Sequence, residues 1–146
     1  MGKNASSCST EQQKMERNLF PLIEEWLGVE LKSDAKVYVG DAHIEPDFIN
    51  EDEKIVGEIF AHIGTLLEGQ KRKLAQDVLK MLLLERNRNV VFRKIIVVCD
   101  KAVYTFLTGK SWLAECISEF GVEIKFWEIS EEERKNIIRA QVRQYR

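Results

Sequence analysis

The sequence predicts an α/β fold in which helices flank a mixed central sheet. Up to residue 64, strand-like segments follow one another with short polar turns between them, which is typical of antiparallel pairing. Beyond that point strand-like and helical segments alternate, as crossovers between parallel strands require. The 146 residues match one ordinary domain. We therefore expect a single domain over residues 10–146, preceded by a disordered tail of small polar residues, 1–9.

The first half of the chain predicts one helix and three strands. The helix begins near Glu11 and carries an apolar stripe at helical spacing, and Pro21 predicts that it is kinked or split. In the third strand the side chains alternate with a period of two, which is the strand signature. The three strands, expected to form one antiparallel meander, are residues 36–39, 43–49 and 54–63.

The second half predicts two parallel strands joined by a helical crossover. Its first strand is continuously apolar, so we expect helices on both of its faces. Ser130 and Glu133 have the spacing of a capping box, which opens a last helix running to the C-terminus. The elements before that helix are a helix at 70–84, a strand at 94–99, helices at 102–107 and 111–120, and a strand at 122–129.

The composition of the sequence indicates the cellular compartment of the protein. No apolar run is long enough to cross a membrane, and no signal-peptide pattern opens the sequence. The cysteines Cys8, Cys99 and Cys116 are scattered and form no CxxC motif, so we expect free thiols in a reducing compartment. A cytoplasmic protein without a membrane partner is the resulting prediction.

Two carboxylates are the leading candidates for a site. The turn at residues 50–53 is short, so Asp47 and Glu58 are expected on adjacent antiparallel strands. Carboxylates held together repel unless a proton or cation lies between them, and Mg²⁺ prefers such oxygen ligands. The alternative is that these are ordinary acidic residues at strand ends. Glu45 shares the expected face of Asp47, and His62 shares that of Glu58.

Charge is unevenly distributed along the chain. Acidic residues predominate between Glu11 and Glu68, whereas basic residues predominate between Gln70 and Lys101. An enzyme that acts on a polyanion needs an acidic metal site beside a basic surface. A solvated helix and loop would produce the same asymmetry without any such function.

The helix expected at 70–84 carries a charged stripe. Lys73, Asp77 and Lys80 lie close together on the helical wheel, next to the stripe that faces the core. The charged stripe is thus partly shielded and either points into a cleft beside Glu58 or forms exposed ion pairs along the helix.

The order of elements carries a resemblance that spans nearly the whole chain. The expected elements follow in the order helix, three-strand meander, helix, strand, helix and strand. Pro46-Asp47 lies on the second strand and Glu58 on the third. This arrangement resembles the PD-(D/E)XK nuclease superfamily and its restriction-endonuclease-like fold. Phe60 occupies the position of the motif lysine. Some members of the superfamily supply this lysine from the following helix, where Lys73 is our candidate; Lys71 and Lys80 are the next choices.

The resemblance implies metal-dependent hydrolysis of a phosphodiester. Asp47, Glu58 and the backbone carbonyl of Ile59 would hold Mg²⁺, with Mn²⁺ as a substitute. Lys73 would stabilise the charge that builds up on the phosphate, and Asp77 would hold Lys73 in place. The residues that would support this site are Asp77, Lys80, His62 and Glu45.

The implied substrate is nucleic acid, with DNA expected and RNA the alternative. A chain this short has little room for a recognition domain, so a DNA endonuclease of weak or structure-based specificity is favoured. Phosphates would be contacted by Lys71, Arg72, Arg86 and Arg88. An inactive nuclease-like domain that binds protein or nucleic acid is the alternative function, and the sequence leaves open whether the chain acts as a homodimer.

Overall fold

A computed structural model describes residues 10–144, with side chains to Arg143. The tail predicted for residues 1–9 lies outside the described residues. Along the described chain the elements are α1 (Thr10–Leu27), β1 (Val37–Val39), β2 (Ala42–Ile44), β3 (Phe48–Asn50), β4 (Ile55–Phe60), α2 (Glu68–Arg88), β5 (Arg93–Val98), α3 (Lys101–Leu107), α4 (Trp112–Glu119), β6 (Val122–Phe126) and α5 (Glu131–Gln144).

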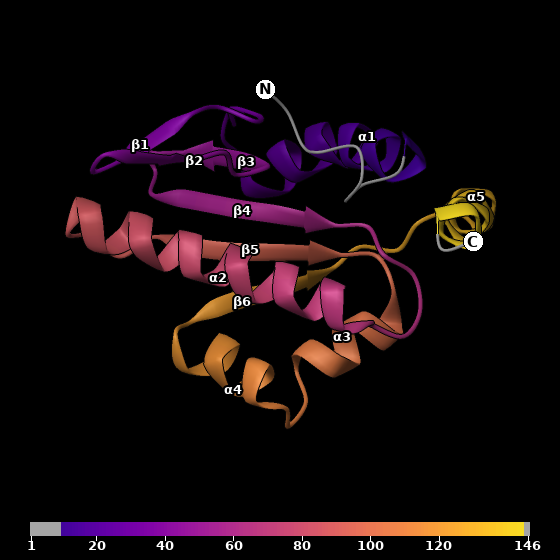
Figure 1. Cartoon of the computed structure of the whole chain (residues 1–146). Helices are drawn as coiled ribbons and strands as arrows, with labels where there is room; N and C mark the ends of the chain where they lie inside the picture. Colours follow the sequence, from indigo (N-terminus) through magenta and orange to yellow (C-terminus); the bar gives the residue numbers. More distant parts are fainter. Residues whose placement is uncertain (1–9, 145–146) are drawn as a thin grey trace.

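A mixed four-stranded sheet in the order β3-β4-β5-β6 forms the centre of the molecule (Figure 1). β3 is antiparallel to β4, with Phe48 opposite Gly57. β4, β5 and β6 are parallel, and Glu58 lies opposite Ile96 of β5. The prediction of an α/β fold with a mixed sheet is therefore confirmed.

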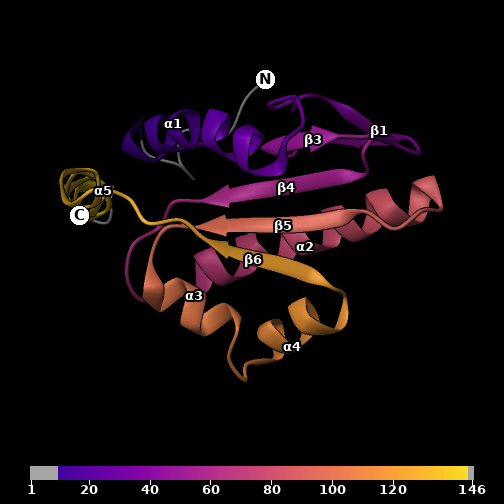
Figure 2. The ribbon, with the colours of Figure 1, turned by 180° about the vertical axis from the view of Figure 1, so that it is seen from behind.

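Helices cover both faces of this sheet (Figures 1 and 2). On one face, apolar residues of α2, α3 and α4 pack against strand residues such as Val56 and Ile96. On the other face α1 packs over Phe48 and Ile59. α5 lies beyond the carboxyl ends of the parallel strands (Figure 1). None of the helices in the described part of the chain is both long and apolar enough to span a membrane.

The predicted three-strand meander is wrong in one respect. The second strand, expected over residues 43–49, is divided into β2 and β3. β2 pairs with β1 in a separate two-stranded sheet, while β3 pairs with β4. Pro46 stands at the division, and because it has no N–H it cannot donate to a strand ladder.

The remaining boundaries differ from expectation at the ends of elements. α1 continues through Pro21 without being split. Pro21 and Arg17 are both exposed, so water can reach the Arg17 carbonyl that loses its helical bond. α2 extends to Arg88 and ends where Asn89 adopts a left-handed conformation with φ 54°. β4 ends at Phe60 and β6 ends at Phe126, both earlier than predicted.

Cys99 and Cys116 are free thiols, as predicted, and Cys8 lies outside the described residues. Burial raises the pKa of the Cys99 thiol to about 12, so it stays protonated and unreactive.

Candidate functional site

Asp47 and Glu58 meet where β3 begins. Asp47 directly precedes β3 and, by the register that sets Phe48 opposite Gly57, lies opposite Glu58 in the middle of β4. The Ile59 N–H donates to Asp47 Oδ2 at 2.7 Å, and the Asp47 N–H donates to Glu58 Oε2 at 3.3 Å. Both side chains are buried, with exposed fractions of 4% and 6%. Reciprocal bonds thus lock the two acidic residues to one another's strands.

The late start of β3 explains this arrangement. The pairing of β3 with β4 covers Ile55 to Gly57 but not Ile59. The Ile59 N–H is therefore bonded by the Asp47 carboxylate instead of by strand backbone. This places the carboxylate beside the sheet, at the gap that Pro46 opens between β2 and β3.

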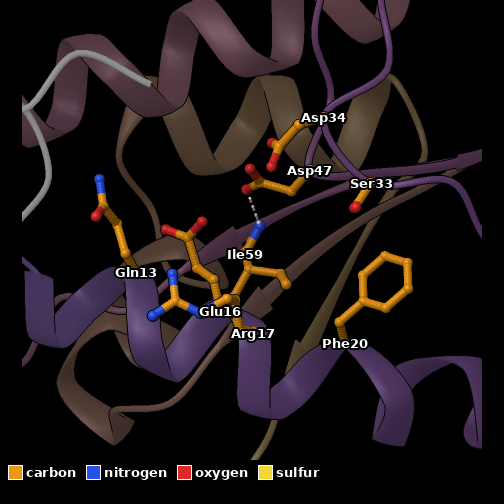
Figure 3. Close-up of a pocket in the computed structure, with 8 residues that line it drawn as sticks. All are labelled: Gln13, Glu16, Arg17, Phe20, Ser33, Asp34, Asp47 and Ile59. Carbon is orange, nitrogen blue, oxygen red and sulfur yellow. Dashed lines mark hydrogen bonds between the residues drawn. The ribbon is translucent and has the colours of Figure 1, made fainter. Parts of the chain in front are cut away.

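A cavity of about 530 Å³ opens beside Asp47 on the side of α1 (Figure 3). In Figure 3 the Asp34 carboxylate lies next to that of Asp47, and Glu16 of α1 projects toward the same space. The residues that line the cavity are Gln13, Glu16, Arg17, Phe20, Ser33, Asp34, Asp47 and Ile59.

Sequence reasoning missed Asp34 and Glu16. A single bridge pairs Lys32 with Ile49 in an antiparallel sense, and continuing this register by two residues sets Asp34 opposite Asp47. Nothing in the sequence marks this pairing, because the segment around Lys32 forms no strand. Glu16 had a detectable signal, since it shares one face of α1 with the other lining residues at positions 13, 17 and 20.

The donor set suits a hard cation better than a soft one, because it consists of oxygens. In the described residues no group of three or more His, Cys, Asp or Glu side chains has the arrangement of a metal site. Mg²⁺ commonly uses only one or two protein carboxylates and keeps several waters. Asp47 and Glu58 supply two carboxylates where β3 meets β4, which meets that requirement in the number and type of ligands.

Lys73 and Asp77 lie on the helix that covers the Glu58 face of the sheet. Glu58 alternates in β4 with Val56 and Phe60, which pack in the same core cluster as α2. Lys73 Nζ lies 3.3 Å from Asp77 Oδ2; the Lys73 side chain is 30% exposed and that of Asp77 is 7% exposed. Asp77 therefore belongs to the layer between α2 and the sheet. Lys80 is exposed to solvent.

Phe60, His62 and Glu45 take structural positions. Phe60 is buried, and its ring lies 5.8 Å from that of His62. His62 lies past the end of β4, with Nε2 3.1 Å from the Thr65 carbonyl, and burial lowers its pKa. Glu45 Oε2 lies 3.7 Å from His43 Nε2 at the end of the β1–β2 hairpin.

Two of the four proposed phosphate contacts already bind within the protein. Lys71 Nζ lies 5.0 Å from the centre of the Phe106 ring. Arg88 donates to Glu51 through Nε at 2.8 Å and to the Tyr38 carbonyl at 2.8 Å, and the bond to Glu51 lowers the pKa of that carboxyl. Arg72 and Arg86 are exposed. The structure thus leaves Arg72 and Arg86 as the better candidates for contacting an extended polyanion.

No protein-family model, curated protein or solved structure matches this chain. The candidate site is therefore defined by its own geometry.

Proposed function

We propose that this protein is a Mg²⁺-dependent endonuclease of weak or structure-based specificity that acts on DNA. The supporting observation is the reciprocal bonding of Asp47 and Glu58, of which Asp47 also lines an acidic cavity. Two buried carboxylates held on adjacent strands are costly unless hydrogen bonds, a cation or a proton compensate them. The resemblance to PD-(D/E)XK nucleases gives the same two residues the role of metal ligands.

Each residue of the proposed site has a distinct role. A bound Mg²⁺ would lower the pKa of a water and neutralise charge on the phosphate. Asp47 and Glu58 would hold the cation, and the Ile59 N–H fixes the direction of the Asp47 carboxylate. Lys73 supplies positive charge to the scissile phosphate, and Asp77 restrains the Lys73 ammonium.

Lys73 replaces a lysine at the position of Phe60. Its ammonium is at the end of a long apolar stem, which can lie along buried aromatic surface while the charge reaches the cleft. α2 packs over the face of β4 that carries Glu58 and Phe60, so the geometry allows this route. We predict that the Lys73 ammonium acts beside Glu58.

A cleavage assay with plasmid, branched DNA and single-stranded RNA, titrated with Mg²⁺ and Mn²⁺, tests the proposal. We expect cleavage of DNA that stops when the divalent cation is chelated. Asp47→Asn and Glu58→Gln should each abolish cleavage, because each removes a charged ligand. Asp52→Asn removes an equal charge from the exposed β3–β4 turn and should retain full activity. Cleavage that survives in Asp47→Asn would exclude the proposed centre.

Lys73→Ala tests the displaced lysine. The variant should keep the fold but lose activity by about a hundredfold or more, as when one charge-stabilising donor is removed. Lys80→Ala removes the same charge from an exposed position on α2 and should cost much less. Equal activity in the two variants would contradict the role given to Lys73.

The alternative function is an inactive nuclease-like binding module. It is favoured by one observation, which is that the motif-lysine position holds Phe60 packed in the core. Wild-type protein that binds DNA or RNA but cuts neither with Mg²⁺ or Mn²⁺ would support this alternative.

A further inference from the structure

β6 is an edge strand of the central sheet. It ends the order β3-β4-β5-β6, and Figure 2 shows it as the last strand of the sheet. The opposite edge differs, because β3 is bridged on its outer side by Lys32. Within residues 10–144, no strand pairs with the outer side of β6. Edge strands of this kind are templates for another strand.

The hydrogen bonds between β6 and β5 show which backbone N–H and C=O groups of β6 point outward, where another strand could bond to them. The Trp127 N–H donates to the Val98 carbonyl of β5 at 2.7 Å, so residue 127 faces β5. Backbone groups alternate along a strand, and therefore Lys125 and Glu123 also face β5. The N–H and C=O groups of Val122, Ile124 and Phe126 point outward.

The sequence of β6 is self-complementary about its middle residue. Val122-Glu123-Ile124-Lys125-Phe126 has Ile124 at its centre, residues of opposite charge on either side and apolar residues at both ends. Edge strands are often protected by charge, but a protecting edge would repel a second copy of itself. This edge has charges that attract a copy related by a two-fold axis.

We propose that β6 pairs antiparallel with β6 of a second copy, centred on Ile124, to form a symmetric homodimer. Ile124 would exchange both of its backbone hydrogen bonds with Ile124 of the second copy, as its outward groups allow. Glu123 would lie opposite Lys125 of the second copy in a non-hydrogen-bonded pair, where side chains approach most closely. The two-fold axis repeats that ion pair, so the interface is isologous.

The charged side of the proposed interface is already ordered. Arg93 Nε and Nη2 donate to the two oxygens of Glu123 at 3.0 and 3.1 Å. Lys125 Nζ lies 5.0 Å from the centre of the Trp26 ring. Because these side chains are held in place, pairing with a second copy costs less conformational entropy.

Exposed aromatic residues extend the other side of the interface. Phe120 directly precedes the turn into β6 and is 46% exposed. Tyr104 of α3 is 38% exposed, and its ring lies 6.4 Å from that of Phe126. A five-residue strand alone buries less than the roughly 1,200 Å² of a stable interface, so a flanking apolar surface of this kind is needed.

Sedimentation velocity of the full chain at about 1 to 100 μM tests the proposal. Wild-type protein should be a dimer. Glu123→Lys sets lysine opposite lysine, and Lys125→Glu sets glutamate opposite glutamate, so each variant should dissociate at least about tenfold more readily. An equimolar mixture of the two variants restores opposite charges at both positions and should recover the dimer. Lys110→Glu changes an exposed charge in the α3–α4 turn and should dimerise like the wild type.

Circular dichroism and thermal unfolding would verify that both variants are folded, since Glu123→Lys also breaks the exposed pair with Arg93. A wild-type chain that stays monomeric throughout this range would overturn the proposal. It would also fall if both charge variants dimerise as tightly as the wild type, or if their mixture remains monomeric.

Discussion

Gly57 shows how one residue positions the candidate site. A Cβ at this position would lie 2.1 Å from Phe48 Cζ and 2.7 Å from the Ile95 carbonyl oxygen. Gly57→Ala would therefore displace the residue that follows Asp47. We expect a loss of about 1–3 kcal/mol in the free energy of unfolding, typical of overpacking.

Urea denaturation measures this loss, and Gly69→Ala is the matched control. A Cβ at Gly69, in the first turn of α2, meets no atom within 4 Å. That variant should be as stable as the wild type or slightly more so, because alanine favours the helix. Equal stability of the two variants would show that Phe48 can move away at little cost.

His62 makes stability depend on pH. Burial lowers its pKa below the ordinary value of 6.5, so the unfolded chain takes up the proton first. The contribution of neutral His62 to the free energy of unfolding is therefore fully present above pH 6.5, and it is lost as the pH falls through and below that value. His62→Gln should flatten the decline of unfolding free energy between about pH 7 and 5.

At the scale of elements, Gln141 of α5 bonds to the segment that follows β4. Gln141 Oε1 accepts from the Ile63 N–H at 2.9 Å, and its Nε2 donates to the Ile63 carbonyl at 2.9 Å. Gln141→Ala should cost about 1–3 kcal/mol, because it leaves both backbone groups unsatisfied. Hydrogen exchange should then accelerate in α5 and around Ile63, while Gln76→Ala, at an exposed position of α2, should change neither region.

Most elements could be predicted because their signals are local. The capping box formed as expected, since the Ser130 N–H donates to Glu133 Oε1 and the Glu133 N–H donates to Ser130 Oγ. The apolar run of β5 is covered on both faces. The division of the second strand could not be read from alternation, which continues across Pro46. It depends on where the chain leaves one sheet and enters another.

At the scale of the molecule, the sequence predicted one part of the candidate site and not the other. The short turn between β3 and β4 made the juxtaposition of Asp47 and Glu58 predictable. Asp34 and Glu16 reach the cavity through the packing of α1 and a single bridge at Lys32, which are tertiary contacts without a local signal. The fold class could also be predicted from local sequence signals, whereas the path of the β1–β2 hairpin could not.

The distribution of charge over the whole molecule leads to a prediction about nucleic-acid binding. The outer face of α2 is basic, because Asp77 is buried and Glu85 is bound to Lys94 at 2.7 Å. Arg72 and Arg86 are exposed on this helix. If nucleic acid lies along α2, Arg72→Glu with Arg86→Glu should weaken binding to all DNA sequences alike.

Titration of DNA binding against salt measures the effect. The slope of log affinity against log salt should fall by about 0.9 for each phosphate that is no longer neutralised, and therefore by about 2 in the double variant. Lys14→Glu with Lys110→Glu makes the same change in net charge at exposed sites away from α2 and should retain the wild-type slope. An unchanged slope in the α2 variant would instead assign the phosphate-binding role to another basic surface, such as Arg139 and Arg143 of α5. The two double variants have the same net charge, so long-range attraction alone would change their binding equally. A change of slope in the α2 variant alone therefore identifies phosphate contacts at Arg72 and Arg86.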